Sequence, residues 1–138
     1  MKTVSDDLGV KKDVASFVVP VGATINMDGT AIMQGLATMF IASTVGVELS
    51  LIQYGQIVLL AMVTSIGTAA VPSAGTVTLA LILGSVGLPL DAIGLILAVD
   101  RILDMIRTSV NVCGDAAVSC IVAKSESELE EKTFNKLG

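Results

Sequence analysis

The sequence contains no histidine and no tryptophan, and its aromatic residues are one tyrosine and three phenylalanines. Without histidine the chain has no Ser-His or Cys-His catalytic pair, no histidine-ligated zinc and no imidazole to change charge near neutral pH. Charge is scarce as well: charged residues make up 15% of the chain and the net charge is −5. A nucleic-acid partner would favour a basic face. With no nucleophile–base pair or metal cage in view, these absences argue against an enzyme and against nucleic-acid binding.

The two cysteines carry little information. Cys113 and Cys120 are seven residues apart on one predicted helix, a separation of about 10 Å. The Cα atoms of a disulfide lie within about 7 Å of each other. We therefore interpret both cysteines as small packing residues.

Apolar residues dominate what is present. They make up 53% of the chain, and the mean hydropathy is +0.84. Most charges lie in residues 1–13 and 124–136, while Glu48 and Asp91 fall in predicted loops. The other charges lie inside apolar sequence, at Asp28, Asp100, Arg101, Asp104, Arg107 and Asp115. A charge in a bilayer costs several kcal/mol, so these residues predict an ion or substrate pathway in an all-α membrane protein.

The distribution of lysine predicts an orientation. Lys11 and Lys12 precede the first apolar run and Lys124 follows the last, whereas the loops near Glu48 and Asp91 carry no Lys or Arg. The positive-inside rule then predicts that both termini are cytoplasmic, with an even number of crossings of the plasma (inner) membrane. The first 13 residues lack the apolar centre of a secretory signal.

Residues 14–46 predict a broken transmembrane helix. The apolar run would be about 50 Å long as one helix, which exceeds a hydrocarbon core of about 30 Å. The polar residues at 26–30 satisfy backbone groups locally and disfavour a helix interior. We expect half-helices over 14–25 and 31–46 and an unwound stretch at 26–30. Such a break is tolerated in a membrane where it lines a cavity or an ion site.

Residues 51–87 predict a re-entrant hairpin. No charge occurs from residue 49 to residue 90, and Gly, Pro, Ser and Thr gather at 65–76. The arms, about 51–65 and 77–87, are short for a full span of about 20 residues. Two short spanning helices are the alternative, but their Lys/Arg-free tip would lie in the cytoplasm. The tip lacks the GK[ST] ending of a phosphate loop.

Residues 91–123 predict the last transmembrane helix, followed by a solvated cytoplasmic tail at 124–138. One narrow stripe on this helix is polar, because its members are spaced by three or four residues: Asp100, Asp104, Arg107, Asn111 and Asp115. The stripe could consist of intrahelical ion pairs, such as Asp104 with Arg107. Alternatively, its excess of oxygen ligands suits Na⁺ or another hard cation.

Three motifs now stand in order along the chain. They are NMDGT at 26–30, SIGTAAVP at 65–72 and DRILDMIRTSVNVCGD at 100–115. Together they resemble the carboxy-terminal third of the dicarboxylate/amino acid:cation symporters, the glutamate transporter family, over about residues 8–125. The resemblance implies a homotrimer in which a mobile transport domain moves as an elevator against a scaffold. The whole of 1–138 would be the carboxy-terminal part of that transport domain, a fragment without its first hairpin and scaffold.

The resemblance also implies a binding site for an acidic amino acid. Asp104 would take the α-ammonium group of glutamate or aspartate, and Arg107 the side-chain carboxylate. The remaining substrate contacts would come from Thr30, Thr108, Asn111 and the backbone at Val71 and Gly75.

Sodium sites follow from the same resemblance. One ion would use backbone oxygens of Gly22, Asn26 and Asn111 with the carboxylate of Asp115. A second would use backbone oxygens of Thr24, Ser65, Ile66 and Thr68, and a third would use Asn26 and Asp28. Coupling to H⁺ in place of Na⁺ stays open.

Sodium-coupled transport of acidic amino acids is therefore the function that we expect. A carrier of C4-dicarboxylates is an alternative, although its substrates offer no ammonium group to Asp104. A neutral amino acid:cation symporter is another. A further possibility is a non-transporting membrane fragment that associates with full-length protomers.

Overall fold

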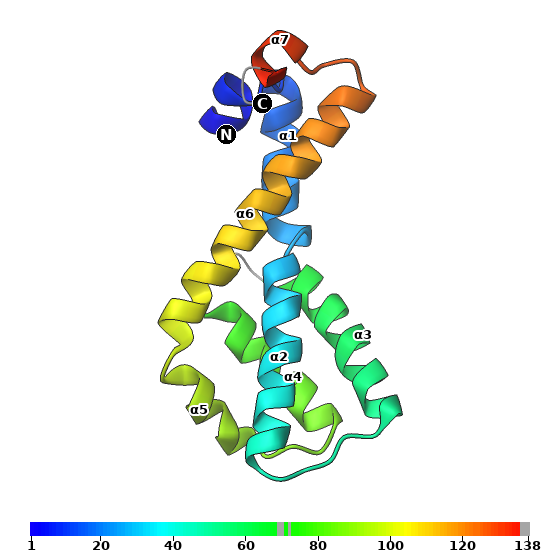
Figure 1. Ribbon diagram of the computed structural model, residues 1–138, viewed down its shortest axis with the longest axis vertical. Coiled ribbons are helices and arrows are strands. Elements are labelled where there is room, and N and C mark those ends of the chain that lie inside the picture. The colour runs from blue at the N-terminus through cyan, green and yellow to red at the C-terminus, as the bar shows by residue number, and fades with distance from the viewer. Residues whose placement is uncertain (69–70, 72, 136–138) are drawn as a thin grey trace.

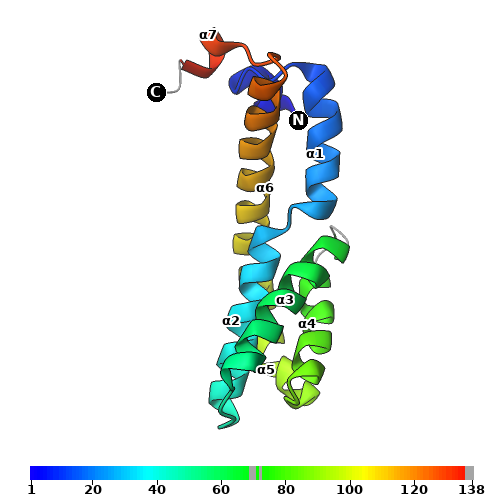
Figure 2. The same cartoon turned by 90° about the vertical axis from the view of Figure 1, so that its right-hand side faces the viewer.

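The computed structural model describes residues 1–68, 71 and 73–135, and within these ranges the regular structure is helical. Residues 69, 70 and 72 of the predicted hairpin tip, and 136–138 of the predicted tail, lie outside the described residues. Both termini lie at one end of an elongated bundle, and the loops after α2 and α4 lie at the other end (Figures 1 and 2). An all-α fold is confirmed for the part of the chain that the structure describes.

The first apolar run is broken, as predicted, into α1 (Lys12–Ile25) and α2 (Asp28–Thr44). The break is shorter than the predicted 26–30, because only Asn26 and Met27 leave the helical conformation (φ −101° and −110°). Asp28 already lies in the first turn of α2, where the positive end of the helix favours an acidic side chain. The backbone N–H of Gly29 is satisfied by the side chain of Asn111, at 2.8 Å.

The next two helices, α3 (Leu51–Gly67) and α4 (Ala74–Ser85), form the two arms of the hairpin. The outer ends of the arms lie at the end of the bundle away from the termini, and their inner ends are directed toward the half that contains the α1–α2 break (Figure 1). Both arms are helical closer to the tip than predicted. Ser50 caps α3 by accepting a hydrogen bond from the backbone of Gln53, whose side chain in turn accepts from the Ser50 backbone.

Apolar side chains join the hairpin to α2. This core contains fully buried residues from all three helices: Ile41, Ile57, Leu79, Ile82 and Leu83. Gln34 of α2 is also fully buried, and its amide donates to the carbonyl of Gly75 (3.1 Å) and to the hydroxyl of Thr78 (2.6 Å), both on α4. The same amide accepts from Thr64 of α3 (3.0 Å). One buried side chain therefore holds both arms of the hairpin.

The prediction of one helix over 91–123 is wrong. A short 3₁₀ turn, η2 (Leu90–Ala92), leads into α5 (Ile93–Leu97), and the chain then turns at Ala98 and Val99 before α6 (Asp100–Ser125). Val99 departs from helical geometry (φ −117°, ψ 2°). Directly after this turn the carboxylate of Asp100 is bonded to the start of α4. α6 packs along α1 in one half of the bundle and along α2 in the other (Figure 1).

The segment predicted as a solvated tail is mostly exposed in its described part, but it is also bonded to the N-terminal segment. α6 continues to Ser125, and the chain beyond it bonds to the N-terminal segment before a short helix, α7 (Glu131–Phe134). A short π-helix, η1 (Thr3–Asp7), precedes that segment. The hydrogen bonds between the two segments join main-chain atoms, so the charge pattern on which the prediction was based does not reveal them.

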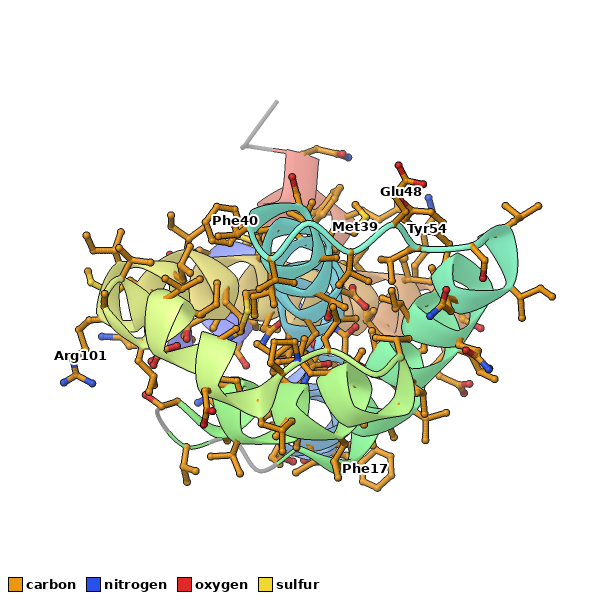
Figure 3. All side chains as sticks on the ribbon, turned by 90° about the horizontal axis from the view of Figure 1, so that it is seen from below. Phe17, Met39, Phe40, Glu48, Tyr54 and Arg101 are labelled. Atoms are coloured by element: carbon orange, nitrogen blue, oxygen red, sulfur yellow. The ribbon has the colours of Figure 1, made fainter. Side chains whose placement is uncertain are left out.

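The surface of the bundle is strongly apolar. Phe17 of α1 is 71% exposed and Leu51 of α3 is 86% exposed, and Figure 3 shows Phe17 and Phe40 on the outside of the helices. Among the described residues, α6 is the one helix that is long and apolar enough to cross a membrane; α3 and α4 are apolar but shorter. Exposed apolar area of this extent is typical of a protein that contacts lipid or further protein.

Candidate functional site

A cavity of about 310 Å³ lies where α6, the α1–α2 break and the start of α4 meet. All seven residues predicted to bind substrate line it: Thr30, Val71, Gly75, Asp104, Arg107, Thr108 and Asn111. Arg107 also lines a larger groove of about 470 Å³ between α2, α5 and α6, but the other side chains of that groove are apolar. The smaller cavity is therefore the one with polar groups that can orient a ligand.

Arg107 is the central charged residue of this cavity. It is 5% exposed, and its Nη2 atom donates to Asp104, one turn earlier on α6. Its Nη1 atom is buried and has no hydrogen-bond partner among the described residues. A buried N–H group of a guanidinium is costly to leave unpaired. The arrangement can therefore accept an additional anionic oxygen.

α4 approaches Arg107 so closely that only glycine fits at position 75. A Cβ atom on Gly75 would contact Nη1 of Arg107 and would lie 3.0 Å from the methyl carbon of Thr30. Gly75 belongs to the first turn of α4, in which the N–H groups of Ala74 and Thr76 donate to the carbonyls of Val71 and Ser73. The close approach brings the backbone of this turn next to the unpaired guanidinium nitrogen.

Asn111 connects α6 to the start of α2. Its Oδ1 atom accepts from the backbone of Gly29, and its Nδ2 atom donates to the hydroxyl of buried Thr30, at 3.4 Å. Thr108 and Val71 are exposed and form the rim of the cavity. The predicted substrate residues therefore include both buried and rim positions.

The structure brings together most of the first predicted sodium site. The Asn26 amide donates to Oδ1 of Asp115 (3.0 Å), and a Cβ atom on Gly22 would overlap the same carboxylate oxygen. A Cβ atom on Gly114 would lie 2.8 Å from Nδ2 of Asn26. Asn111, the remaining predicted ligand, is one turn before Asp115 on α6. These contacts bring the side chains of Asn26 and Asp115 close to the backbone of Gly22.

The second predicted site is less closely assembled. Ser65 and Thr68 are buried, whereas Thr24 and Ile66 are exposed. The hydroxyl of Thr24 donates to the carbonyl of Val21 within α1. Although α1 contacts α3, no hydrogen bond joins Thr24 to the described residues of the hairpin.

The third predicted site rests on Asp28, which is exposed at the start of α2. A Cβ atom on Gly114 would lie 3.4 Å from its carboxylate, so Asp28 lies on the same side of α6 as Asn26. Within the described ranges, no three acidic, His or Cys side chains gather in a way that could hold a metal ion. A cation here would depend largely on backbone and amide oxygens, as the predicted sites do.

Asp100 belongs to the polar stripe predicted from the sequence, and the structure gives it a role that its spacing does not indicate. Its carboxylate accepts from the hydroxyls of Ser73 (2.6 Å) and Thr76 (2.5 Å), and Asp100 is 5% exposed. Ser73 has a left-handed backbone (φ 62°) immediately before α4. Asp100 therefore joins the inner end of α4 to the start of α6. The regular spacing of the stripe marks Asp100 as a polar position, but it does not reveal the partners of Asp100, which are 24 and 27 residues away in the sequence.

Comparison with known proteins decides the family. The model of the sodium:dicarboxylate symporter family matches residues 1–125. The chain belongs to this family. It is 54% identical over 119 residues to an excitatory amino acid transporter of Onchocerca volvulus and, to the same extent, to one of Caenorhabditis elegans; each match covers 86% of the chain and 24% of the relative.

A mammalian relative matches the chain to a similar extent. The chain is 52% identical over 130 residues to excitatory amino acid transporter 2 of Mus musculus, covering 94% of the chain and 23% of that protein. The chain thus spans about a quarter of the length of the curated relatives it matches. The resemblance to the glutamate transporter family is confirmed, and these proteins are transporters, not enzymes.

Proposed function

We propose that this chain is part of a sodium-coupled symporter for acidic amino acids. The observation that carries the proposal is the buried, unpaired Nη1 atom of Arg107 in the cavity of about 310 Å³. Membership of the sodium:dicarboxylate symporter family and similarity to excitatory amino acid transporters support the same function. The planar fork of arginine binds the two oxygens of a carboxylate at once.

Asp104 and Arg107 are the two charged groups that the substrate would meet. Their internal ion pair balances both charges when no ligand intervenes. The ammonium group of an amino acid would turn toward Asp104, and its distal carboxylate would turn toward Arg107. The hydroxyl of Thr30, the amide of Asn111, Thr108 and the backbone at Val71 and Gly75 would complete the contacts.

Sodium is the coupling ion that we propose, with H⁺ as the alternative to be tested. The contact of Asn26 with Asp115 and the close approach of Gly22 support a first ion there. Ser65 and Thr68 lie near the inner end of the hairpin, so an ion held by their backbone and that of Thr24 and Ile66 would fix the hairpin. Because each ligand would stabilise the conformation that the other prefers, their binding would be coupled. Asn26 and Asp28 would contribute to a third ion.

The architecture proposed for the whole protein follows the family. Residues 14–46 and 51–87 would be the broken helix and the re-entrant hairpin of an elevator-type transport domain, and α6 would be its last transmembrane helix. The hairpin would act as its gate. The domain would be embedded in the lipid bilayer of the plasma (inner) membrane, with both termini of this segment cytoplasmic. The rest of the transporter would supply the scaffold and the contacts of a homotrimer.

Uptake into vesicles tests the proposal. The whole protein that contains this chain, reconstituted into liposomes with sodium outside and potassium inside, should accumulate labelled aspartate or glutamate, and serine and succinate should compete poorly. Uptake that follows an imposed proton gradient without sodium would make H⁺ the coupling ion. Saturable uptake of succinate alone would favour a C4-dicarboxylate carrier, and uptake of serine alone a neutral amino acid carrier.

Residues 1–138 reconstituted alone form a second arm of this experiment. We expect no uptake, because alternating access needs two bodies that move against each other. Sodium-driven uptake by the isolated chain would contradict the elevator arrangement. If neither the chain nor the whole protein transports, but the chain co-purifies with transporting protomers, the chain is an associating membrane fragment.

A further inference from the structure

The N-terminal segment and the segment after α6 pair through their main chains. Glu130 donates its backbone N–H to the carbonyl of Gly9 (2.8 Å), and Lys11 donates its own to the carbonyl of Glu128 (3.1 Å). Between these bonds Val10 and Leu129 form an antiparallel bridge. The side chains of Lys11 and Glu128 also form an ion pair. We name residues 9–11 with 128–130 the terminal clasp.

The terminal clasp covers a small apolar core of its own. Val10 is 1% exposed and Val4 6% exposed, and they pack with Ala15 of α1 and Ala123 of α6, which are fully buried. Leu129 packs against the same core. The clasp thus stabilises the contact between α1 and α6 by burying apolar surface, because the exposed Lys11–Glu128 pair contributes little.

Gly9 makes this pairing possible. Its backbone is left-handed (φ +74°), and a Cβ atom would lie 2.8 Å from the carbonyl oxygen of Glu130. Any other residue would therefore be strained and would push the two segments apart. Gly46, in the loop after α2, has a similar backbone (φ +72°), but a Cβ atom there would meet nothing within 4 Å. The two glycines differ in their contacts and share their conformation.

The terminal clasp and the first candidate cation site lie at opposite ends of the same helix pair. Ten residues separate Lys12 from Gly22 on α1, and ten separate Asp115 from Ser125 on α6, which is about 15 Å along each axis. α1 and α6 lie side by side over this length (Figure 1). Since a Cβ atom on Gly22 would overlap the carboxylate of Asp115, the two helices lie close together here, and a small change in their separation alters the spacing of the ligands.

The geometry points to the terminal clasp as a positioning element that sets the cation affinity of the site formed by Gly22, Asn26 and Asp115. The inference rests on the proposed function, because it takes sodium as the cation. Binding constellations must be held to within about 0.5 Å of the productive geometry. A pair of helices fixed at one end holds its far end at a more constant separation than a free pair does. Opening the clasp therefore weakens sodium binding without touching any ligand.

Sodium-dependent thermal stability of the whole protein in detergent tests this inference. The readout is the sodium chloride concentration that gives half of the maximal rise in Tm, measured at constant ionic strength with choline chloride. We expect Gly9→Ala to raise this concentration about fivefold or more. The matched Gly46→Ala variant should lower Tm at all salt concentrations and leave the half-maximal concentration unchanged.

A cross-linked variant serves as the rescue. In a background without other cysteines, Val10→Cys and Leu129→Cys can form a disulfide across the bridge. In the reduced form of this double variant, the half-maximal sodium concentration should be higher than in the wild type. Oxidation to the disulfide should return it toward the wild-type value, and reduction should raise it again. This pair also decides the question if Gly9→Ala does not fold.

Two results would overturn the inference, and they can be told apart. In the first result, Gly9→Ala lowers Tm as Gly46→Ala does without changing the half-maximal sodium concentration, or the oxidised and reduced cysteine pairs have the same half-maximal sodium concentration. The clasp then serves stability alone, and the proposed function stands. If sodium does not stabilise the wild-type protein, sodium coupling fails and the inference fails with it.

Discussion

Arg107 donates to Asp104 from one turn further along α6, while a second nitrogen of the same guanidinium is buried without a partner in the described part of the chain. The internal pair supports the interpretation of the polar stripe as ion pairs that neutralise each other. The unpaired nitrogen supports the role that the family resemblance implies, a contact with an anionic group of the substrate. The ion pair and this role are compatible, because Arg107 has more donors than Asp104 can satisfy in this geometry.

Replacing Arg107 should change substrate specificity. We expect Arg107→Cys in the whole protein to reduce aspartate and glutamate affinity by about 2–5 kcal/mol, or roughly 30- to 5000-fold, because the distal carboxylate loses its partner. Small neutral amino acids such as serine should still bind. Arg101→Cys is the control, since Arg101 is on the same helix but points away from the bundle (Figure 3). Wild-type aspartate affinity in Arg107→Cys would leave the intrahelical ion pair as the role of Arg107.

Replacing Asp104 should act on a different part of the substrate. Asp104→Asn removes the negative charge proposed to meet the α-ammonium group, so we expect aspartate and serine to lose affinity alike. Competition binding with aspartate, serine and succinate separates the two variants. Unchanged amino-acid binding in Asp104→Asn, with succinate bound tightly, would favour the dicarboxylate carrier.

Asp115 should govern the ion more than the substrate. Asp115→Asn keeps the shape of the side chain but removes the charge next to Asn26 and Gly22. We expect weaker sodium affinity and, at limiting sodium, a higher Kd for aspartate through linkage. Saturating sodium should recover most of the substrate affinity. A Kd for aspartate that stays high at every sodium concentration would assign Asp115 to the substrate instead.

Gly75 should tolerate no side chain, although alanine favours helices. Gly→Ala within a helix adds about 1 kcal/mol of stability where space allows. At Gly75 the new methyl group would collide with Arg107, so we expect Gly75→Ala to weaken aspartate binding by tenfold or more, about 1.4 kcal/mol. Gly84→Ala, on the same helix α4 with open space around it, should raise Tm and leave binding unchanged. Equal affinities in both variants would show that α4 moves away from Arg107 when ligand binds.

Asp100 should control the hairpin. Asp100→Asn weakens two charge-assisted hydrogen bonds, from Ser73 and Thr76, each of which contributes about 1.5–3 kcal/mol. We expect faster cleavage by proteases near the hairpin tip and faster release of aspartate. Thr76→Val, which removes one donor and keeps the side-chain shape, should show the same effect at lower amplitude. Asp91→Asn is the control, because the Asp91 side chain forms no hydrogen bond with the described residues. Protease rates in Asp100→Asn equal to those of this control would contradict the role.

The sequence predicted the helices of this bundle better than their ends. The polar run around Asn26 identified the broken helix, because these residue types disfavour a helix interior, and the long charge-free run identified the hairpin. The turn at Val99 could not be predicted, since no Pro or polar cluster marks it. Its cause is tertiary: Asp100, the next residue, is bonded to the start of α4.

For the candidate site too, local spacing predicted one part, and contacts between helices determine the rest. Spacing alone placed Asp104, Arg107 and Asn111 on one face of α6, and the cavity lies there. The roles of Asp100 and of Gln34 depend on partners from another helix, which no local pattern encodes. The pairing of the two terminal segments was missed for the same reason, as it uses main-chain atoms that every residue has.

The two-residue break at Asn26 and Met27 has an electrostatic consequence. α1 ends there and α2 begins there, so carbonyl groups of one helix and N–H groups of the next point into the same gap. The aligned peptide dipoles give the end of α1 a partial negative charge and the start of α2 a partial positive charge. The backbone therefore favours a cation at the end of α1 and an anion at the start of α2, and a positive ion bound at the first end strengthens the attraction for an anion at the second.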